Sequence, residues 1–506
     1  MPARLVLAAL VALALAAGLC ATLRLVGGPG VGAGDNSDGG RLFCAAGLTP
    51  DATGQRSNWR GVVVTEFDTG GEECPPGAAM TSAAVILEAA VALAPLLDDG
   101  GPAPDGTVRF SLRWLAMLYA LLLGVGAGLA AFATTARSPA LLAVLVPPLL
   151  PLLAVPWWSR FLVSTYGETA GLLGTVWVAL GLAALAVTRP ADRGARWCAL
   201  VLLAAGGIVA TTAKPAFLPV GLVAVAACVL VAVGSGGTST ARRRFPGVLL
   251  AVTVVALSAV PLASAVRAQE QFYLVNNVHD VVFTAVLVEA GPAATVPLGL
   301  RPEAAEHAGE GYYHDTGDGV PGYLETVAAR PEQLREAVYE YLAAHPRVPA
   351  TMVHRGLMAT ALPQLPYLPS TGGGPGTVVS EPLDFHPEAW LLMGGLFASL
   401  DALPAPFLPA GLVTVAVVAG AATVVVPRAR RPRTGPGAAS VGLVRCAAAL
   451  ALAGLGIVTL AVLGDGYFEL PKHVWLASYA LLVAASTLVA SVAAAVAGTV
   501  AARRPA

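Results

Sequence analysis

The chain has 506 residues, of which 56% are hydrophobic and 12% are charged, and its mean hydropathy is +0.72. Soluble proteins carry about 25% charged residues, so this composition excludes an ordinary soluble domain and predicts a membrane protein. The net charge of −1 excludes a nucleic-acid partner, because the chain has no basic domain that could neutralise phosphates in bulk.

Long apolar runs recur from end to end, and a transmembrane helix needs about 20 apolar residues. The pattern predicts an all-α polytopic membrane protein with about ten transmembrane helices. We interpret the first run as an uncleaved span and not as a signal peptide, because a whole membrane domain follows it. The expected spans are Leu5–Val26, Phe110–Thr135, Ala140–Trp158, Thr169–Thr188, Cys198–Thr212, Pro215–Val233, Gly247–Val266, Pro406–Val426, Leu443–Leu463 and His473–Val496.

The topology depends on the run Met80–Leu97, which is short and is followed by two aspartates. If this run does not cross the membrane, Arg4 and the arginines between the later spans fall in the cytoplasm, as the positive-inside rule favours. We therefore expect an amphipathic helix lying flat on the outer surface. Both termini are then cytoplasmic, and two large loops, Gly27–Val108 and Ala268–Glu388, are extracytoplasmic.

The second large loop is predicted to be a partly helical cap over the membrane. Apolar residues recur near helical spacing within Gly322–Ala344, and Pro331 is expected to start a helix. The chain is thus predicted to divide into an N-terminal transmembrane module at 1–267, which includes loop 27–108 and helix 80–97, a cap loop at 268–390, and C-terminal transmembrane helices at 391–506. No internal repeat is evident, which argues against an inverted-repeat transporter.

Two aspartates follow the first span in the sequence "GDNSDGGRL". Asp35 and Asp38, three residues apart and beside Arg41, suit a general base or a metal site at the membrane surface. The alternative is a solvated turn, since Asp, Asn and Gly are ordinary turn formers. Cys44 and Cys74 share this loop and could form a disulfide in an oxidising compartment; the alternative is two free thiols.

Further polar residues meet the same membrane face in "WWSRFLVSTYGETAG" and in "TTAKPAF". Boundary charges such as Arg160 and Glu168 are expensive and usually functional, although Glu168 could simply favour a helix N-terminus and Tyr166 could belong to an aromatic belt. Lys214 occupies a tight turn on the side where the positive-inside rule disfavours cations. It could bind a lipid phosphate or snorkel to the interface.

Two further candidate sites remain. One is Asn277, which lies after the span that ends near Val266, and the other is the turn "GDGYFELPKH". Polar side chains directly above the membrane suit recognition of hydroxyl groups, although helix capping would also explain an Asn there. The turn holds two acids and two basic groups, which is more than a connector needs; the alternative is a local salt-bridge network. Its candidate residues are Asp465, Glu469, Lys472 and His473.

The chain resembles the GT-C superfamily of membrane glycosyltransferases, and more narrowly bacterial hexosyltransferases of the WsfD-like type. The resemblance is carried by "GDNSDGGRL", "STYGE", "AKP", "VNN…VF" and "GDGYFELPKH". It implies a GT-C-like bundle in a bacterial cell membrane, a sugar donor linked to polyprenyl phosphate, and a glycan, lipid or protein acceptor. Transfer would occur outside the cytoplasm with inversion. The acidic pair here is Asp-x-x-Asp and not two adjacent acids, which leaves open which carboxylate is catalytic.

The resemblance also implies roles for the residues. Asp35 or Asp38 would deprotonate an acceptor hydroxyl, and the cations would stabilise the lipid phosphate as it leaves. A divalent cation, Mg²⁺ or Mn²⁺, could bridge phosphate and carboxylate, but no ligand set in the sequence identifies one. The cations named for the phosphate are Lys214, Arg160 and Lys472, and the residues named for the sugar hydroxyls are Glu168, Tyr166 and Asn277.

Three other functions remain open. A ligase or polymerase of lipid-linked glycans would share the outer arginines and the large loop. A lipid or glycan flippase would carry polar residues at mid-bilayer depth, whereas the centres of the expected spans are nearly free of charge. A non-catalytic assembly protein would tolerate the loss of both Asp35 and Asp38.

Overall fold

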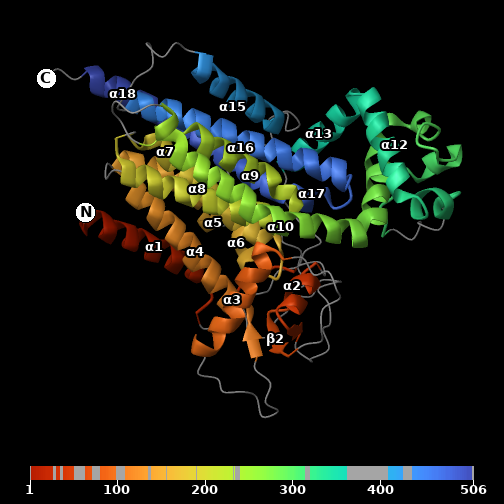
Figure 1. Cartoon of the computed structure of the whole chain (residues 1–506), viewed down its shortest axis with the longest axis horizontal. Coiled ribbons are helices and arrows are strands. Elements are labelled where there is room, and N and C mark those ends of the chain that lie inside the picture. Colours follow the sequence, from red (N-terminus) through yellow and green to blue (C-terminus); the bar gives the residue numbers. More distant parts are fainter. Residues whose placement is uncertain are drawn as a thin grey trace.

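The computed structural model describes most of the chain as long helices with a helical cap at one end (Figure 1). Both termini lie at the opposite end, at the left of that view. The residues described are 2–26, 30–34, 38–50, 63–70, 80–97, 109–134, 138–154, 156–189, 191–231, 233, 240–313, 320–361, 408–425 and 436–503.

Eight helices in the described ranges are long and apolar enough to cross a membrane, which confirms the predicted all-α polytopic class. The two other predicted spans form shorter helices, α5 with three internal prolines and α9 after the 3-10 turn Pro215–Phe217. The ten helices are α1 (Pro2–Thr22), α4 (Leu112–Ala133), α5 (Ser138–Ala154), α7 (Glu168–Val187), α8 (Arg193–Ala213), α9 (Leu218–Leu230), α10 (Thr240–Asp280), α15 (Leu408–Val425), α16 (Pro436–Gly464) and α18 (Trp475–Arg503).

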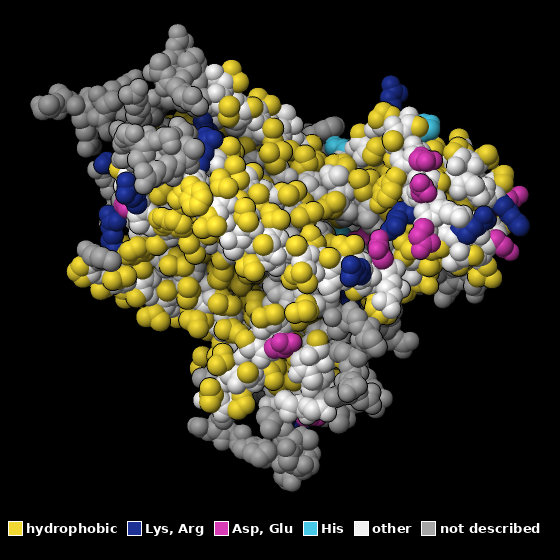
Figure 2. All heavy atoms as spheres, in the orientation of Figure 1, with side chains coloured by type: hydrophobic (Ala, Val, Ile, Leu, Met, Phe, Trp, Pro, Cys, Tyr) yellow, Lys and Arg dark blue, Asp and Glu magenta, His cyan; other side chains and the backbone are white. Residues whose placement is uncertain are grey.

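On the face drawn in Figure 2, apolar side chains cover the bundle, whereas charged side chains gather on the cap and at the opposite end. On α10, for example, Val252, Val255 and Val260 are 58%, 58% and 71% exposed. Apolar area of this kind is unfavourable in water at about 25 cal/mol per Å² and is suited to lipid tails. The chain is therefore an integral, multi-pass membrane protein.

The longest helix, α10, extends beyond the bundle. Its 41 residues span about 60 Å at 1.5 Å per residue, twice the roughly 30 Å of a bilayer core. It passes without a break through residue 267, where the sequence suggested a domain boundary, and continues into a π-helix at Val281–Val286 and α11 (Leu287–Ala290). The C-terminal part of α10 therefore supports the cap.

The cap is built from α12 (Pro331–Ala344) and α13 (Arg347–Ala359). Helix α12 begins at Pro331, as predicted, and it buries Leu334, Val338 and Leu342. Proline fits this first position because its missing N–H would have no partner there. The segment before Pro331, where the sequence also predicted helical spacing, forms a short π-helix at Leu324–Ala328. Two residues separate this π-helix from α12.

The first loop contains a small antiparallel sheet that the sequence did not indicate. Strands β1 (Leu48–Pro50), β2 (Glu66–Thr69) and β3 (Arg109–Ser111) pair in that order, with Phe67 opposite Phe110. Helix α2 (Gly40–Ala45) leads into β1, and the rings of Phe43 and Phe67 lie 5.3 Å apart. The sheet thus anchors the segment that follows Asp38.

Helix α3 (Ser82–Leu97) corresponds to the predicted interfacial helix. It is too short to count among the eight candidate spans. Its first residue is fixed to α8, because the Ser82 hydroxyl donates to the Val209 carbonyl at 2.8 Å. Its orientation relative to the membrane plane stays a prediction.

The two ends of the bundle carry different polar groups. At the end that holds both termini, Arg4 pairs with Asp192 at 3.4 Å, and Arg445 Nε donates to the Thr423 hydroxyl. At the opposite end lie Glu168, which begins α7, Lys214, which follows α8, and Lys472 in α17 (Leu470–His473), between α16 and α18. The compartment that each end faces stays a prediction.

Helices α7 and α8 cross at two glycines. A Cβ at Gly174 would lie 2.5 Å from the backbone nitrogen of Ala210 and 2.6 Å from the Gly206 carbonyl oxygen, whereas a Cβ at Gly411 in α15 would meet nothing within 4 Å. We expect Gly174→Ala to destabilise the protein by about 1–3 kcal/mol through overpacking. Gly411→Ala should be neutral or stabilising by up to about 1 kcal/mol. Thermal unfolding in detergent measures both, and equal melting temperatures would contradict the close crossing.

Candidate active site

The first loop enters the site beside the turn that precedes α7. The Ala33 N–H donates to the Val163 carbonyl at 3.3 Å, which holds the loop against the segment Arg160–Tyr166. Asp38 follows in the turn two residues before α2, and it is partly buried. Asp35 lies outside the described residues, so its predicted role stays a prediction.

Asp38 is held by two cations, one on each oxygen. Lys472 Nζ lies 2.7 Å from Oδ2, and Arg41 Nη2 donates to Oδ1 at 2.8 Å. Burial alone would raise the pKa of Asp38, but the charges of Lys472, Arg41 and Lys214 outweigh it and hold the pKa well below its usual range. Asp38 is therefore a carboxylate, and the pairing joins the first loop to the last polar turn.

Lys472 lies in the one-turn helix α17 (Leu470–His473) and is only 6% exposed. Besides Asp38 it donates to Glu469 Oε2 at 2.6 Å, and its ammonium lies 6.0 Å from the centre of the Tyr166 ring. Burial would lower the pKa of Lys472, but the two carboxylates raise it above its usual value. Lys472 thus stays charged although it is almost excluded from water.

A second ion pair joins the start of α7 to the turn after α8. Lys214 Nζ lies 2.7 Å from Glu168 Oε1, and Glu168 is 7% exposed. Burial would lower the pKa of Lys214, but Glu168, Asp38 and Asp465 together raise it. Lys214 therefore belongs to the same electrostatic cluster as Asp38, although 176 positions separate them in the sequence.

The turn between α16 and α17 brings Asp465 and His473 together, with His473 Nδ1 3.3 Å from Asp465 Oδ2. Burial raises the pKa of Asp465, although Lys214 and Lys472 oppose the change. Burial, reinforced by the same two lysines, lowers the pKa of His473 well below its usual range. His473 is therefore neutral, so its contact with Asp465 is not an ion pair.

The backbone of this turn is strained. Glu469 has φ +46°, in the left-handed region, which costs about 1–3 kcal/mol for a residue with a side chain. Gly466 also has positive φ, and a Cβ there would lie within 2.5 Å of the Asp280 carbonyl oxygen and the Thr284 hydroxyl. The turn is thus pressed closely against α10, which presents its own polar face to the cluster.

That face of α10 contributes residues that the sequence analysis did not assign to the site. The Arg41 guanidinium lies 4.6 Å above the Tyr273 ring, a distance suited to a cation–π contact. Two turns later Asp280 Oδ1 accepts a hydrogen bond from the Tyr312 backbone at 2.7 Å. The helical spacing of Tyr273 and Asp280 would have identified both, had α10 been predicted to continue beyond the membrane.

Two further predicted site residues, Tyr166 and Arg160, are buried. Tyr166 is buried and packs on Phe161, with 5.3 Å between ring centres. Arg160 is 1% exposed, and its Nε and Nη1 have no hydrogen-bond partner among the described residues. Burial lowers the pKa of Arg160 well below its usual value. Arg160 is therefore a buried guanidinium with two nitrogen donors that no described residue accepts from.

Asn277 is the one predicted site residue, among those described, that lines a separate cavity next to the cluster. Its neighbour Asn276 donates to the Tyr313 hydroxyl at 2.9 Å. Cys44 is disulfide-bonded. Its predicted partner, Cys74, lies outside the described residues, so the pairing of these two cysteines stays a prediction.

The described acids do not fit a divalent cation. Asp38, Glu168 and Glu469 each already bind a lysine at 2.6–2.7 Å, so their charge is neutralised. No group of three His, Cys, Asp or Glu side chains within the described ranges could hold a metal ion. The arrangement is instead one of alternating carboxylates and cations, suited to binding an anion by exchange of partners.

A different, apolar cavity of about 1,870 Å³ opens at the other end of the bundle. It lies between α5, α7, α9, α16 and α18, and Arg4, Arg189, Arg196 and Arg445 line its polar edge. Of the predicted site residues in the described ranges, none lines this cavity.

The neutral state of His473 has a consequence for pH dependence. Because its pKa is lower in the folded chain than in the unfolded chain, the unfolded chain binds more protons as the pH falls below about 6.5. The contribution of His473 to stability is thus complete above that pH and is lost below it. We expect the melting temperature to fall on mild acidification, and His473→Gln to reduce that dependence. His345→Gln, at an exposed histidine of the cap, is the matched control; an unchanged acid dependence in His473→Gln would contradict the assignment.

Comparison with known proteins places the chain in a family. No curated protein and no solved structure matches it. The family model described as the YfdI N-terminal transmembrane domain matches residues 3–326, which is more than half of the 506 residues. The match includes Asp38, Glu168 and Lys214 but ends before the turn of Lys472. The chain belongs to the family of the YfdI N-terminal transmembrane domain.

Proposed function

We propose that this protein is a membrane glycosyltransferase that moves a sugar from a polyprenyl-phosphate donor to an acceptor hydroxyl at the extracytoplasmic face. The observation that carries the proposal is the cluster of Asp38, Lys214, Asp465 and Lys472. Four side chains from three distant segments meet at one end of a membrane bundle. The family of the matched domain is associated with GT-C-like glycosyltransferases, which agrees with this chemistry.

The cations suit the leaving group. When the bond between the anomeric carbon and the phosphate oxygen breaks, its electron pair stays on the lipid phosphate, and fixed cations stabilise that charge. Arg41 is the accessible one, with 56% of its side chain exposed, and Lys214 and Lys472 lie deeper. A phosphate that binds Arg41 and Lys472 competes directly with Asp38 for both.

This competition gives Asp38 a way to become a base. In the resting protein its two cations keep its pKa low and make it a weak proton acceptor. Donor phosphate would draw those cations away, raise the affinity of Asp38 for a proton, and free an oxygen for the acceptor hydroxyl. The acceptor oxygen then bonds to the anomeric carbon from the face opposite the phosphate, its proton moves to the carboxylate, and the configuration inverts.

Asp35 and Asp465 are the other candidates for the base. Asp35 shares the motif with Asp38, and Asp465 has a pKa that burial raises toward the operating range of a general base. Tyr166, whose ring centre lies 6.0 Å from Lys472 Nζ, and Glu168, which pairs with Lys214, are proposed to orient the sugar hydroxyls.

A lipid transporter is the second candidate function. The apolar cavity of about 1,870 Å³ favours it, because such a space suits lipid chains. A transporter would move a labelled polyprenyl-phosphate sugar across a vesicle membrane without consuming it, whereas the enzyme consumes the donor. A ligase or polymerase of lipid-linked glycans differs from both in requiring a glycan, and not a single sugar, on the donor.

We expect Asp38→Asn to lower the rate of sugar transfer by at least about 100-fold, the usual effect of losing a general base, with normal protein levels in the membrane. Asp35→Asn and Asp465→Asn, measured in parallel, identify the proton acceptor. Asp68→Asn is the control, because Asp68 lies in β2 near Arg109 and not in the cluster. Normal transfer in all three test variants would exclude an aspartate base.

We expect Lys214→Ala to raise the KM for the donor more than the KM for the acceptor, because Lys214 is assigned to the phosphate. The variant also leaves Glu168 buried and unpaired, at a cost of about 3–5 kcal/mol. The double variant Lys214→Ala/Glu168→Gln removes that stranded charge, so it should recover stability but not donor use. Equal effects on the two KM values would argue against a phosphate role.

A further inference from the structure

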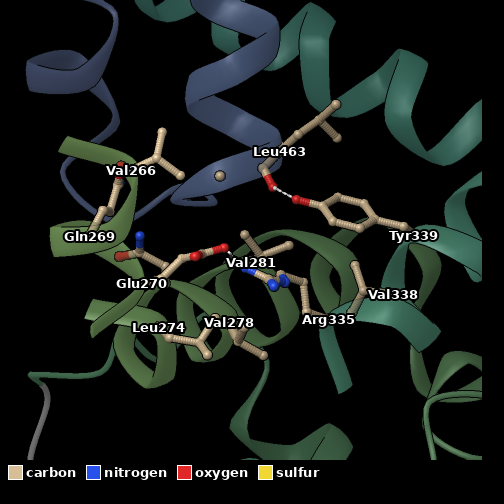
Figure 3. Close-up of a pocket in the computed structure, with 12 residues that line it drawn as sticks. Val266, Gln269, Glu270, Leu274, Val278, Val281, Arg335, Val338, Tyr339 and Leu463 are labelled. Carbon is tan, nitrogen blue, oxygen red and sulfur yellow. Dashed lines mark hydrogen bonds and ion pairs between the residues drawn. The ribbon is translucent and has the colours of Figure 1, made fainter. Parts of the chain in front are cut away.

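A cavity of about 190 Å³ lies between α10, the cap helix α12 and the last turn of α16 (Figure 3). Its volume is about six times the 30 Å³ that one water molecule occupies in the liquid, enough for a ring-sized ligand. The three walls come from segments near residues 270, 335 and 463. The cavity therefore exists only because the cap docks on the extended part of α10.

The polar groups of this cavity include charges of both signs. Arg335 Nη1 and Glu270 Oε1 are 3.4 Å apart, and the Tyr339 hydroxyl donates to the Leu463 carbonyl at the same distance (Figure 3). Charge-assisted hydrogen bonds are usually about 2.7–2.9 Å long, so the ion pair is loose. Both of its members are at least a third exposed, which leaves donors and acceptors for a ligand.

Two side-chain amides complete the polar lining. Gln269 and Asn277 border the cavity, and in the described part of the chain no hydrogen-bond partner exists for either amide group. Each amide offers two donors and an acceptor. A neutral ligand with many hydroxyl groups, each both donor and acceptor, matches this set better than an anion, because the charges of Arg335 and Glu270 cancel and leave no net positive charge.

The rest of the lining is apolar. Leu274 and Val278 project from α10, Val281 projects from the π-helix that continues it, and Val338 faces them from α12 (Figure 3). A hexose ring has hydroxyl groups around its edge and C–H groups on its faces, so it can use both kinds of wall at once.

The cavity adjoins the ionic cluster. Gly464, which lines it, directly precedes Asp465, and Asn277 follows Tyr273 by about one turn on α10. We propose that this cavity binds a hexose unit of the acceptor and thereby directs the acceptor hydroxyl toward the carboxylates of the cluster. The inference rests on the proposed function, and it adds the cap residues Arg335 and Tyr339 to the site.

Binding can be tested separately from catalysis. The full chain, purified in detergent, is examined by saturation-transfer NMR with millimolar methyl glycosides of glucose, mannose and galactose as probes. We expect saturation transfer to at least one glycoside, and about tenfold weaker binding in Arg335→Gln, since a hydrogen bond to a charged group is lost. Tyr339→Phe, which keeps the ring and removes only the hydroxyl, should also weaken binding. Arg347→Gln, at an exposed arginine of α13 outside the cavity, should bind like wild type.

The outcomes separate the two proposals. If wild type binds none of the glycosides, or if Arg335→Gln and Tyr339→Phe, each with a wild-type melting temperature, bind as well as wild type, the subsite is refuted. Active transfer with an unchanged KM for the acceptor in both variants would also refute the subsite while leaving the enzyme intact. Binding that is sensitive to Arg335 in a protein that transfers no sugar would instead refute the proposed function and keep the subsite.

Discussion

The polar end of this molecule depends on the charge of Lys472. A lysine that is 6% exposed would lose its proton or unfold its surroundings if it had no partner, because burying an unpaired charge costs several kcal/mol. It is balanced by Asp38 from the first loop and Glu469 from its own turn. The pairing therefore joins chain segments more than 400 residues apart and fixes where the first loop lies. It also explains why the left-handed backbone of Glu469 is tolerated, since the carboxylate must reach back to the lysine.

The same constraint relates stability to reactivity. Every described carboxylate that pairs with a lysine in the cluster does so at 2.6–2.7 Å. Removing one partner of such a pair is destabilising, because the other charge is then left buried and unpaired. An incoming anion can replace a carboxylate as the partner of a cation without leaving a bare charge. In the proposed reaction, a site made of exchangeable pairs would remain folded without substrate and release a carboxylate when the donor phosphate binds.

Sequence patterns predicted the helices better than they predicted the contacts. Apolar runs predicted all ten bundle helices, and Pro331 predicted the start of α12, because both signals are local in the sequence. The positive-inside rule grouped Glu168, Lys214 and the turn of Lys472 on one face, but it carries no information on pairing. Nothing in the sequence indicated that Lys472 binds Asp38 or that Asn277 turns toward a separate cavity, since those contacts depend on packing between distant segments. The sheet of the first loop was missed because its strands are only three or four residues long.

Helix α10 is the element that links these features. It is twice as long as the membrane requires, and its extended part presents Tyr273 and Asp280 to the ionic cluster, and Glu270 and Asn277 to the neighbouring cavity. One rigid helix thus sets the distance between a site suited to phosphate and a site suited to a sugar. A flexible loop could carry the same side chains, but it could not hold two substrates within the few tenths of an ångström that reaction geometry demands. The proposed reaction would therefore account for the length of α10.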